Sequence, residues 1–104
     1  GDSKMNEQTM IWFLKKSAQH QLSREAVMLW MDFYAYLQNL SRAQYPRIGF
    51  IELRSICDLE QEQFLAACRE LETAAMLKME LKQGCLYCRL VAGRLYKTPH
   101  TTAG

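Results

Sequence analysis

The sequence predicts one mainly α-helical domain that ends in a β-hairpin. Nearly half of its 104 residues are apolar, at 49%, which suits a single core. Apolar residues recur at spacings of three and four through most of the chain, and they begin to alternate only after residue 76. The 2 prolines and 5 glycines are too few to punctuate a fold of many strands. We therefore expect one domain at residues 5–97, after a cloning remnant at residues 1–4 and before a flexible tail at residues 98–104.

Residues 6–20 are the first expected helix. Met10, Phe13 and Leu14 fall on one helical face, with Ile11 and Trp12 beside it. This spacing predicts a short amphipathic helix.

The second expected helix begins at an N-cap, Ser23, and runs to about Ser41. Its apolar stripe recurs at spacings of three and four: Val27, Trp30, Met31, Tyr34, Leu37 and Leu40. Further apolar residues widen that stripe: Met28, Leu29, Phe33 and Tyr36. A helix with such a wide apolar face either lies at the centre of the core or also packs on another chain, and we favour the central position.

Pro46 ends the second helix, because proline lacks an amide donor and forces its predecessor out of helical geometry. Residues 47–50 then form a short extended bridge. A helix of about two turns follows at residues 51–57, and residues 58–60 make a tight turn.

The next expected helix covers residues 61–76. One helical stripe runs along it at offsets of four, seven and eleven residues: Phe64, Cys68, Leu71 and Ala75. Beyond it, Leu77, Met79 and Leu81 alternate with charged residues, as in a half-buried strand. A turn at residues 83–84 and a second strand at residues 85–90 complete the hairpin.

The four cysteines do not require disulfides in a chain this apolar. Cys85 and Cys88 have the spacing of half a zinc site, but the sequence supplies no second half. We favour structural cysteines in a strand and keep metal and redox roles as alternatives; no cofactor is expected. No Gly-rich phosphate loop or HExxH motif indicates an enzyme, and no apolar stretch approaches membrane-spanning length. We expect a non-enzymatic, cytoplasmic protein.

This order of elements resembles a winged helix-turn-helix domain preceded by an extra N-terminal helix. The resemblance is carried by the apolar positions of the two short helices and the entry to the hairpin: Leu53, Ile56, Cys57, Leu59, Phe64, Cys68, Leu71, Met76 and Leu77. The sequence departs from the family pattern at three positions. Asp58 stands at a turn position where Gly is common, Glu60 stands where Ser or Thr usually caps the helix, and Ala75 replaces a common Gly before the hairpin. Within the superfamily, the first helix is similar to that of MarR-type regulators and DnaD-type replication proteins.

The resemblance implies binding to double-stranded DNA, in transcriptional regulation or in the replication or transfer of a mobile element. The helix at residues 61–76 would face the major groove with Gln61, Gln63 and Arg69. The hairpin would contact phosphates through basic residues on its strands and beyond them: Lys78, Lys82, Arg89 and Arg94.

The distribution of charge supports a rival interpretation. Residues 51–76 carry a net charge of −4 and residues 77–104 a net charge of +4, so the helix expected to approach DNA is acidic. The alternative is therefore an interaction module that docks a basic protein through Glu60, Glu62 and Glu70. A homodimer formed through Met10, Trp12 and Phe13 is compatible with either function.

Overall fold

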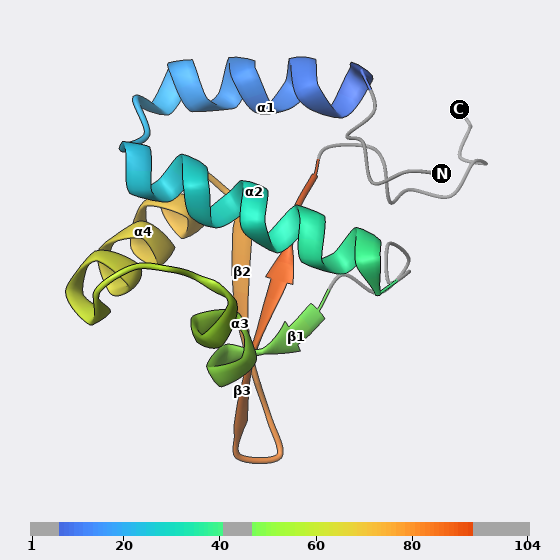
Figure 1. Ribbon diagram of the computed structural model, residues 1–104, viewed down its shortest axis with the longest axis vertical. Helices are drawn as coiled ribbons and strands as arrows, with labels where there is room; N and C mark the ends of the chain where they lie inside the picture. The colour runs from blue at the N-terminus through green and yellow to red at the C-terminus, as the bar shows by residue number, and fades with distance from the viewer. Residues whose placement is uncertain (1–6, 41–46, 93–104) are drawn as a thin grey trace.

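Helices dominate the part of the chain that the structure describes, residues 7–40 and 47–92 of a computed structural model (Figure 1). In chain order the elements are α1 (Glu7–His20), α2 (Arg24–Asn39), β1 (Arg47–Gly49), α3 (Phe50–Ile56), α4 (Gln61–Thr73), β2 (Leu77–Lys82) and β3 (Cys85–Leu90). The predicted class, mainly α with a β-hairpin near the C-terminus, is confirmed. The expected break at Pro46, the remnant and the tail lie outside the described residues.

The three strands form one antiparallel sheet in the order β1-β3-β2. The hairpin turns at Gln83 and Gly84, whose φ angles of 53° and 79° suit a two-residue turn between twisted strands. The expected extended bridge is a third strand, since Arg47 pairs with Arg89 and Gly49 with Tyr87. Its three residues are too few to show the alternation by which a strand is recognised.

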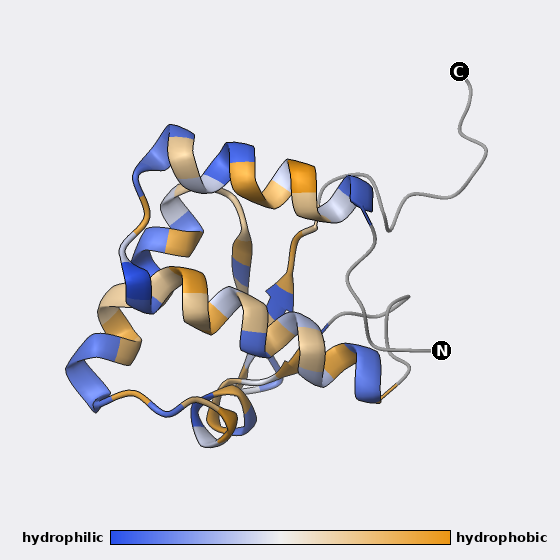
Figure 2. Cartoon of the chain, turned by 45° about the horizontal axis from the view of Figure 1, so that its top comes forward, coloured by the Kyte–Doolittle hydropathy of each residue, from blue (hydrophilic) through white to orange (hydrophobic). Residues whose placement is uncertain are grey.

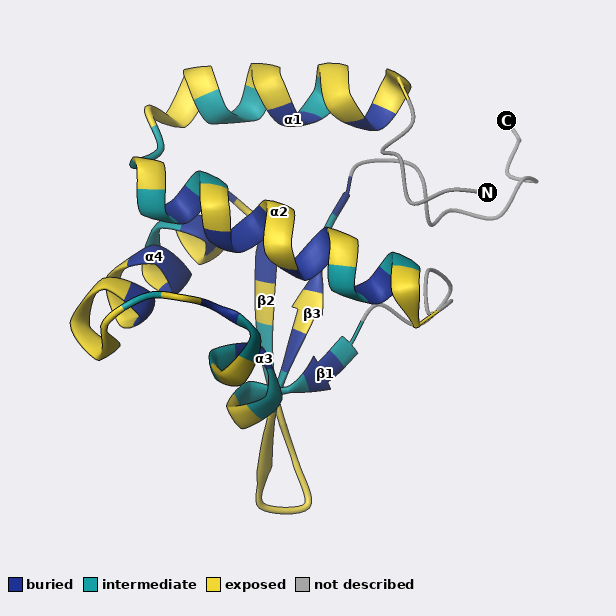
Figure 3. Ribbon diagram, viewed as in Figure 1, coloured by how far each residue is buried: buried dark blue, intermediate teal, exposed yellow. Residues whose placement is uncertain are grey.

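The core lies around α2, which packs between α1 on one side and α4 and the sheet on the other (Figures 1 and 3). Trp30 is fully buried at the centre. The Phe13 ring stacks on it with centroids 4.4 Å apart, and the Tyr34 ring stacks at 5.3 Å. The indole Nε1 donates a hydrogen bond to the Val91 carbonyl at 3.1 Å, so Trp30 joins α1, α2 and the end of the sheet.

The buried face of α2 is rotated from the predicted stripe. Leu29 and Phe33, expected only to widen the stripe, are fully buried, whereas Met31 and Leu40 are exposed. Figure 2 shows hydrophobic and hydrophilic positions recurring along both α1 and α2. The central position of α2 is confirmed, because its largest side chains fill the core.

α4 ends three residues earlier than predicted, at Thr73. Ala75 adopts a φ of 61°, the Met76 amide donates to the Leu71 carbonyl at 2.8 Å, and the Ala75 amide donates to the Glu72 carbonyl at 3.0 Å. These two bonds define a Schellman C-cap, a motif that usually places glycine where Ala75 stands. The prediction that Ala75 belongs to the buried stripe is wrong: Ala75 is exposed.

The tip of the hairpin extends past the core (Figure 3). Leu81 is 73% exposed, although the alternation predicts a half-buried position. Its neighbours on the same face of β2, Leu77 and Met79, are covered to decreasing degrees towards the tip. The helices cover only the base of the hairpin, and alternation alone gives no information on how far that cover reaches.

Candidate functional site

The sheet presents one face to the core and the other to the outside. Side chains of directly paired residues share a face, so the register assigns each residue to one side. Buried residues such as Ile48, Cys88 and Leu90 define the core face. We call the opposite side the outer face; its residues are Arg47, Gly49, Lys78, Glu80, Lys82, Cys85, Tyr87 and Arg89.

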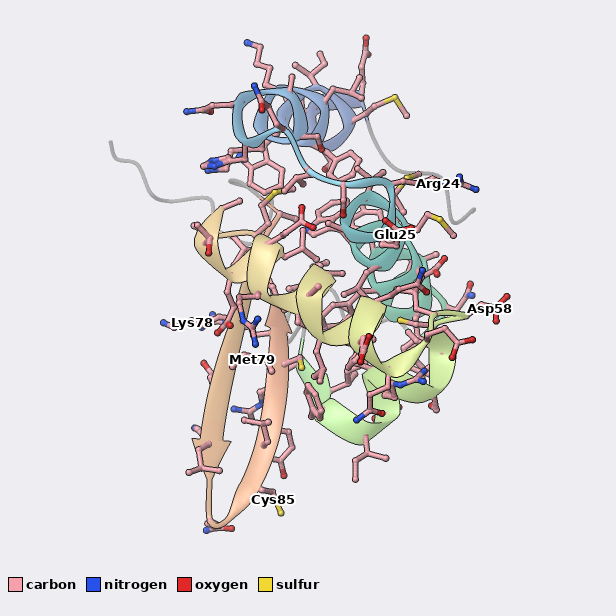
Figure 4. All side chains as sticks on the ribbon, turned by 90° about the vertical axis from the view of Figure 1, so that its left-hand side faces the viewer. Arg24, Glu25, Asp58, Lys78, Met79 and Cys85 are labelled. Carbon is pink, nitrogen blue, oxygen red and sulfur yellow. The ribbon has the colours of Figure 1, made fainter. Side chains whose placement is uncertain are left out.

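Three cations form one row across the outer face. Arg89 on the central strand pairs with Arg47 on β1 and with Lys78 on β2. Neighbouring strands lie about 4.8 Å apart, so the row spans roughly 10 Å. Lys78 points away from α4 (Figure 4). Like charges directly opposite one another destabilise a sheet, so this row has a cost that the fold itself does not require.

One carboxylate moderates that repulsion. Glu80 lies 3.4 Å from the Arg47 guanidinium and 3.7 Å from that of Arg89. Both arginine side chains keep almost half of their surface exposed, at 41% and 49%, so each can still accept an anion. With Lys82 nearer the tip, the outer face holds four cations and a single carboxylate among its residues.

The wing residues predicted from the sequence thus come together in part. Lys78, Lys82 and Arg89 share the outer face, whereas Arg94 lies outside the described residues. Sequence reasoning missed Arg47, which the β1 pairing brings into the same row from more than 30 residues away. Arg47 could have been predicted only if residues 47–49 had been recognised as a strand that pairs with β3.

The three residues predicted to read DNA from α4 have different surroundings. Gln61 is exposed. Gln63 belongs to a capping box, in which its side-chain oxygen accepts from the Glu60 amide at 3.0 Å. Arg69 is exposed and lines an open cleft of about 320 Å³ between α4 and the end of α1. The cleft is lined by His20, Leu22, Ala66, Arg69, Glu70 and Thr73. Gln61 and Arg69 are therefore both accessible, whereas the Gln63 side chain is engaged in the helix cap.

Two of the three acids expected to dock a basic protein stabilise helix ends. The Glu70 carboxylate accepts from the Ser23 amide at 2.8 Å and from the Ser23 hydroxyl at 2.7 Å. The Ser23 hydroxyl in turn accepts from the Ala26 amide at 3.1 Å, which confirms Ser23 as the N-cap of α2. Glu60 caps α4 in the box described above, and Glu62 is exposed in its first turn. The acidity of this segment is therefore partly structural.

The residues proposed for a homodimer differ in how far they are buried. Phe13 is buried against Trp30, and Trp12 lies half-buried with its ring centroid 6.0 Å from that of Trp30. Met10 is exposed, as are Ile11 and Leu14. The dimer stays a prediction, and the apolar surface that α1 offers to it is formed by Met10, Ile11 and Leu14.

Cys85 and Cys88 do not form a joint site. Cys85 is exposed on the outer face and Cys88 is buried on the core face, because residues three apart in a strand point to opposite sides. Burial raises the pKa of the Cys88 thiol to about 12 and that of the Cys68 thiol to about 11, so both stay protonated at neutral pH. Within residues 7–40 and 47–92, no cluster of three His, Cys, Asp or Glu side chains is placed to hold a metal ion.

None of the helices in the described ranges is both long and apolar enough to span a bilayer. No family model, no curated protein and no solved structure matches this chain.

Proposed function

We propose that this chain is a winged helix-turn-helix protein that binds double-stranded DNA. The order α2, β1, α3, α4, β2, β3 and the strand order β1-β3-β2 are compatible with a winged-helix arrangement. The observation that carries the function is the row of Arg47, Arg89 and Lys78 across the outer face. Glu80 offsets only one of the three positive charges in this row, and the phosphate backbone of DNA is a regular array of anions that would offset the others.

In this proposal the outer face supplies affinity and α4 supplies any sequence preference. Phosphate contacts fix the position of a protein on DNA, while base edges are read by side chains such as glutamine and arginine. Gln61 and Arg69 on α4 are the candidate readers, since Gln63 is engaged in the helix cap. Regulation of transcription, or replication and transfer of a mobile element, are the processes in which we place such a protein.

Fluorescence anisotropy with a labelled DNA duplex over a series of salt concentrations tests the proposal. Lys78→Gln combined with Arg89→Gln should weaken binding uniformly across sequences and reduce the slope of log K against log salt by about 2. The matched control is Lys15→Gln combined with Lys16→Gln on α1, which removes the same charge from the end of the molecule opposite the hairpin tip (Figure 1). Equal losses in the two double variants, or no salt-dependent binding by the native chain, contradict the proposal.

A basic protein partner is the second candidate, and one observation favours it. Leu65 on α4 is 38% exposed, and Glu62 and Glu72 are exposed three residues before it and seven after it, on adjoining parts of the helix surface. An apolar residue flanked by acids suits a basic peptide. Under this alternative Glu62→Lys abolishes partner capture, whereas under the DNA proposal the same substitution strengthens duplex binding. Glu70 is unsuitable for this test because its carboxylate holds Ser23, the N-cap of α2.

A further inference from the structure

The outer face carries one aromatic ring at its centre, that of Tyr87. Tyr87 lies on the middle strand, one row nearer the tip than Arg89, with Gly49 opposite it on β1 and Glu80 opposite it on β2. The Arg47 guanidinium crosses over the ring at 5.1 Å from its centroid and reaches Glu80 on the far strand. A planar cation thus already stands on the π face of Tyr87, with almost half of its side chain open to solvent.

Gly49 leaves the space beside this ring empty. Its φ of −66° and ψ of 151° are accessible to any residue, so its backbone does not require glycine. A Cβ at this position would meet no atom within 4 Å. Aromatic residues often compensate for a strand glycine by covering it, but Tyr87 does not, because a covering ring would lie within that distance. Glycine here keeps the backbone open to close approach, as strand glycines beside ligands do.

We infer that Tyr87 and Arg47 form a stacking platform for one unpaired base of single-stranded DNA. The inference rests on the proposed function and deepens it, since the neighbouring cations Arg89 and Lys78 would hold the phosphates that flank the base. Aromatic rings and arginine planes are side-chain surfaces on which unpaired bases stack, and here the Arg47 guanidinium lies over the Tyr87 ring, so the site combines both in one stack. The opening over Gly49 gives the base its approach to the ring.

Three labelled probes test the platform by anisotropy at one salt concentration: a short oligodeoxythymidylate, an abasic oligonucleotide of the same length, and a duplex. The native chain should bind the thymidylate more tightly than the abasic strand, which carries the same phosphates without bases. Tyr87→Leu should weaken thymidylate binding about tenfold and leave abasic and duplex binding unchanged. Tyr87→Phe is the matched control and should bind like the native chain, because it keeps the ring and loses only the hydroxyl.

Gly49→Leu provides a second, independent variant. A Cβ at Gly49 meets no atom within 4 Å, so we expect the melting temperature to be retained while the added side chain blocks the approach to Tyr87 and thymidylate binding falls. If the native chain binds the thymidylate and the abasic strand equally, or if Tyr87→Leu has no effect on the thymidylate, the platform is refuted. If the platform is refuted but duplex binding still depends on Lys78 and Arg89, the proposed DNA-binding function is retained. If the native chain binds none of the three probes, the platform and the proposed function are both refuted.

Discussion

At the scale of single residues, Glu70 links two helices that are distant in the sequence. Its carboxylate binds both the amide and the hydroxyl of Ser23, which lies 47 residues earlier in the chain. Ser23 in turn caps α2, so one side chain of α4 fixes the start of the central helix. Charged hydrogen bonds of this kind are stronger than neutral ones. The position of α2 relative to α4 therefore depends on a residue that its own sequence neighbourhood does not reveal.

Glu70→Ala should lower the free energy of unfolding by about 2 kcal/mol, because it removes two charge-assisted hydrogen bonds to the α2 cap. Urea titration followed by tryptophan fluorescence measures the loss. Glu72→Ala is the control: it removes an exposed carboxylate from the last turn of the same helix, where a negative charge is unfavourable, and should leave stability unchanged or slightly raised. Equal losses in the two variants would contradict the role given to Glu70.

The role of a residue can be predicted from the sequence when its partners lie nearby in the chain, and not when they are distant. Ser23 is identified as a cap from its immediate neighbours, and Phe64, Cys68 and Leu71 are identified as core from their spacing; the structure confirms all four. Glu70 resembles any other acid of a solvated helix in the sequence, because its partner is distant. Arg47 is missed as a member of the outer face for the same reason.

At the scale of elements, the ends of α1 and α4 depart from common sequence preference. Gln21 and Ala75 both have positive φ angles, 51° and 61°, and both follow a helix. L-residues pay roughly 1–2 kcal/mol for this conformation, which glycine adopts without steric cost. α1 and α4 thus both end with the hydrogen bonds of a Schellman motif, but neither has glycine, the residue that adopts this conformation at least cost.

Ala75→Gly should raise the free energy of unfolding by about 0.5–1 kcal/mol. Glycine relieves the strain of the left-handed conformation, and the greater entropy of glycine in the unfolded chain offsets part of that gain. Thermal unfolding monitored by circular dichroism measures the gain. Ala74→Gly, one residue earlier and buried in a right-handed conformation, is the matched control and should be destabilising. A lower melting temperature for Ala75→Gly would show that Ala75 is not strained.

Most elements follow from sequence pattern, because each of the longer ones has enough residues to show its period. The two strands of the hairpin and all four helices are predicted within a few residues of their observed bounds. β1 is the exception, since a strand of three residues shows no period and its existence depends on pairing with β3. The early end of α4 has a different cause: alanine is an excellent helix former, so Ala74 and Ala75 conceal a stop imposed by the Schellman bonds.

At the scale of the whole molecule, three buried thiols make stability depend on alkaline pH. Burial raises the pKa of the Cys57 and Cys88 thiols to about 12 and that of Cys68 to about 11, from an ordinary value of 9.0. Above pH 9 the unfolded chain releases these protons and the folded chain retains them. The folded state therefore binds more protons, and its stability decreases as pH rises from 9 towards 12.

The free energy of unfolding should fall by more than about 1 kcal/mol between pH 9 and pH 11. Urea titrations at a series of pH values measure this slope. Cys57→Ala removes one of the three groups and should give a shallower slope, which separates the thiols from the lysines and tyrosines that also titrate there. A slope identical to that of the native chain would contradict this account.

The strand order has a consequence for how copies of this molecule meet. β2 is an outer strand of the sheet, so one side of its backbone is available to pair with a strand from another copy. Lys78 and Lys82 lie four residues apart on the same face of that strand. A second hairpin that approached edge to edge would bring its own lysines close to them. The same charges that we assign to phosphate thus also discourage the sheet from growing into an aggregate.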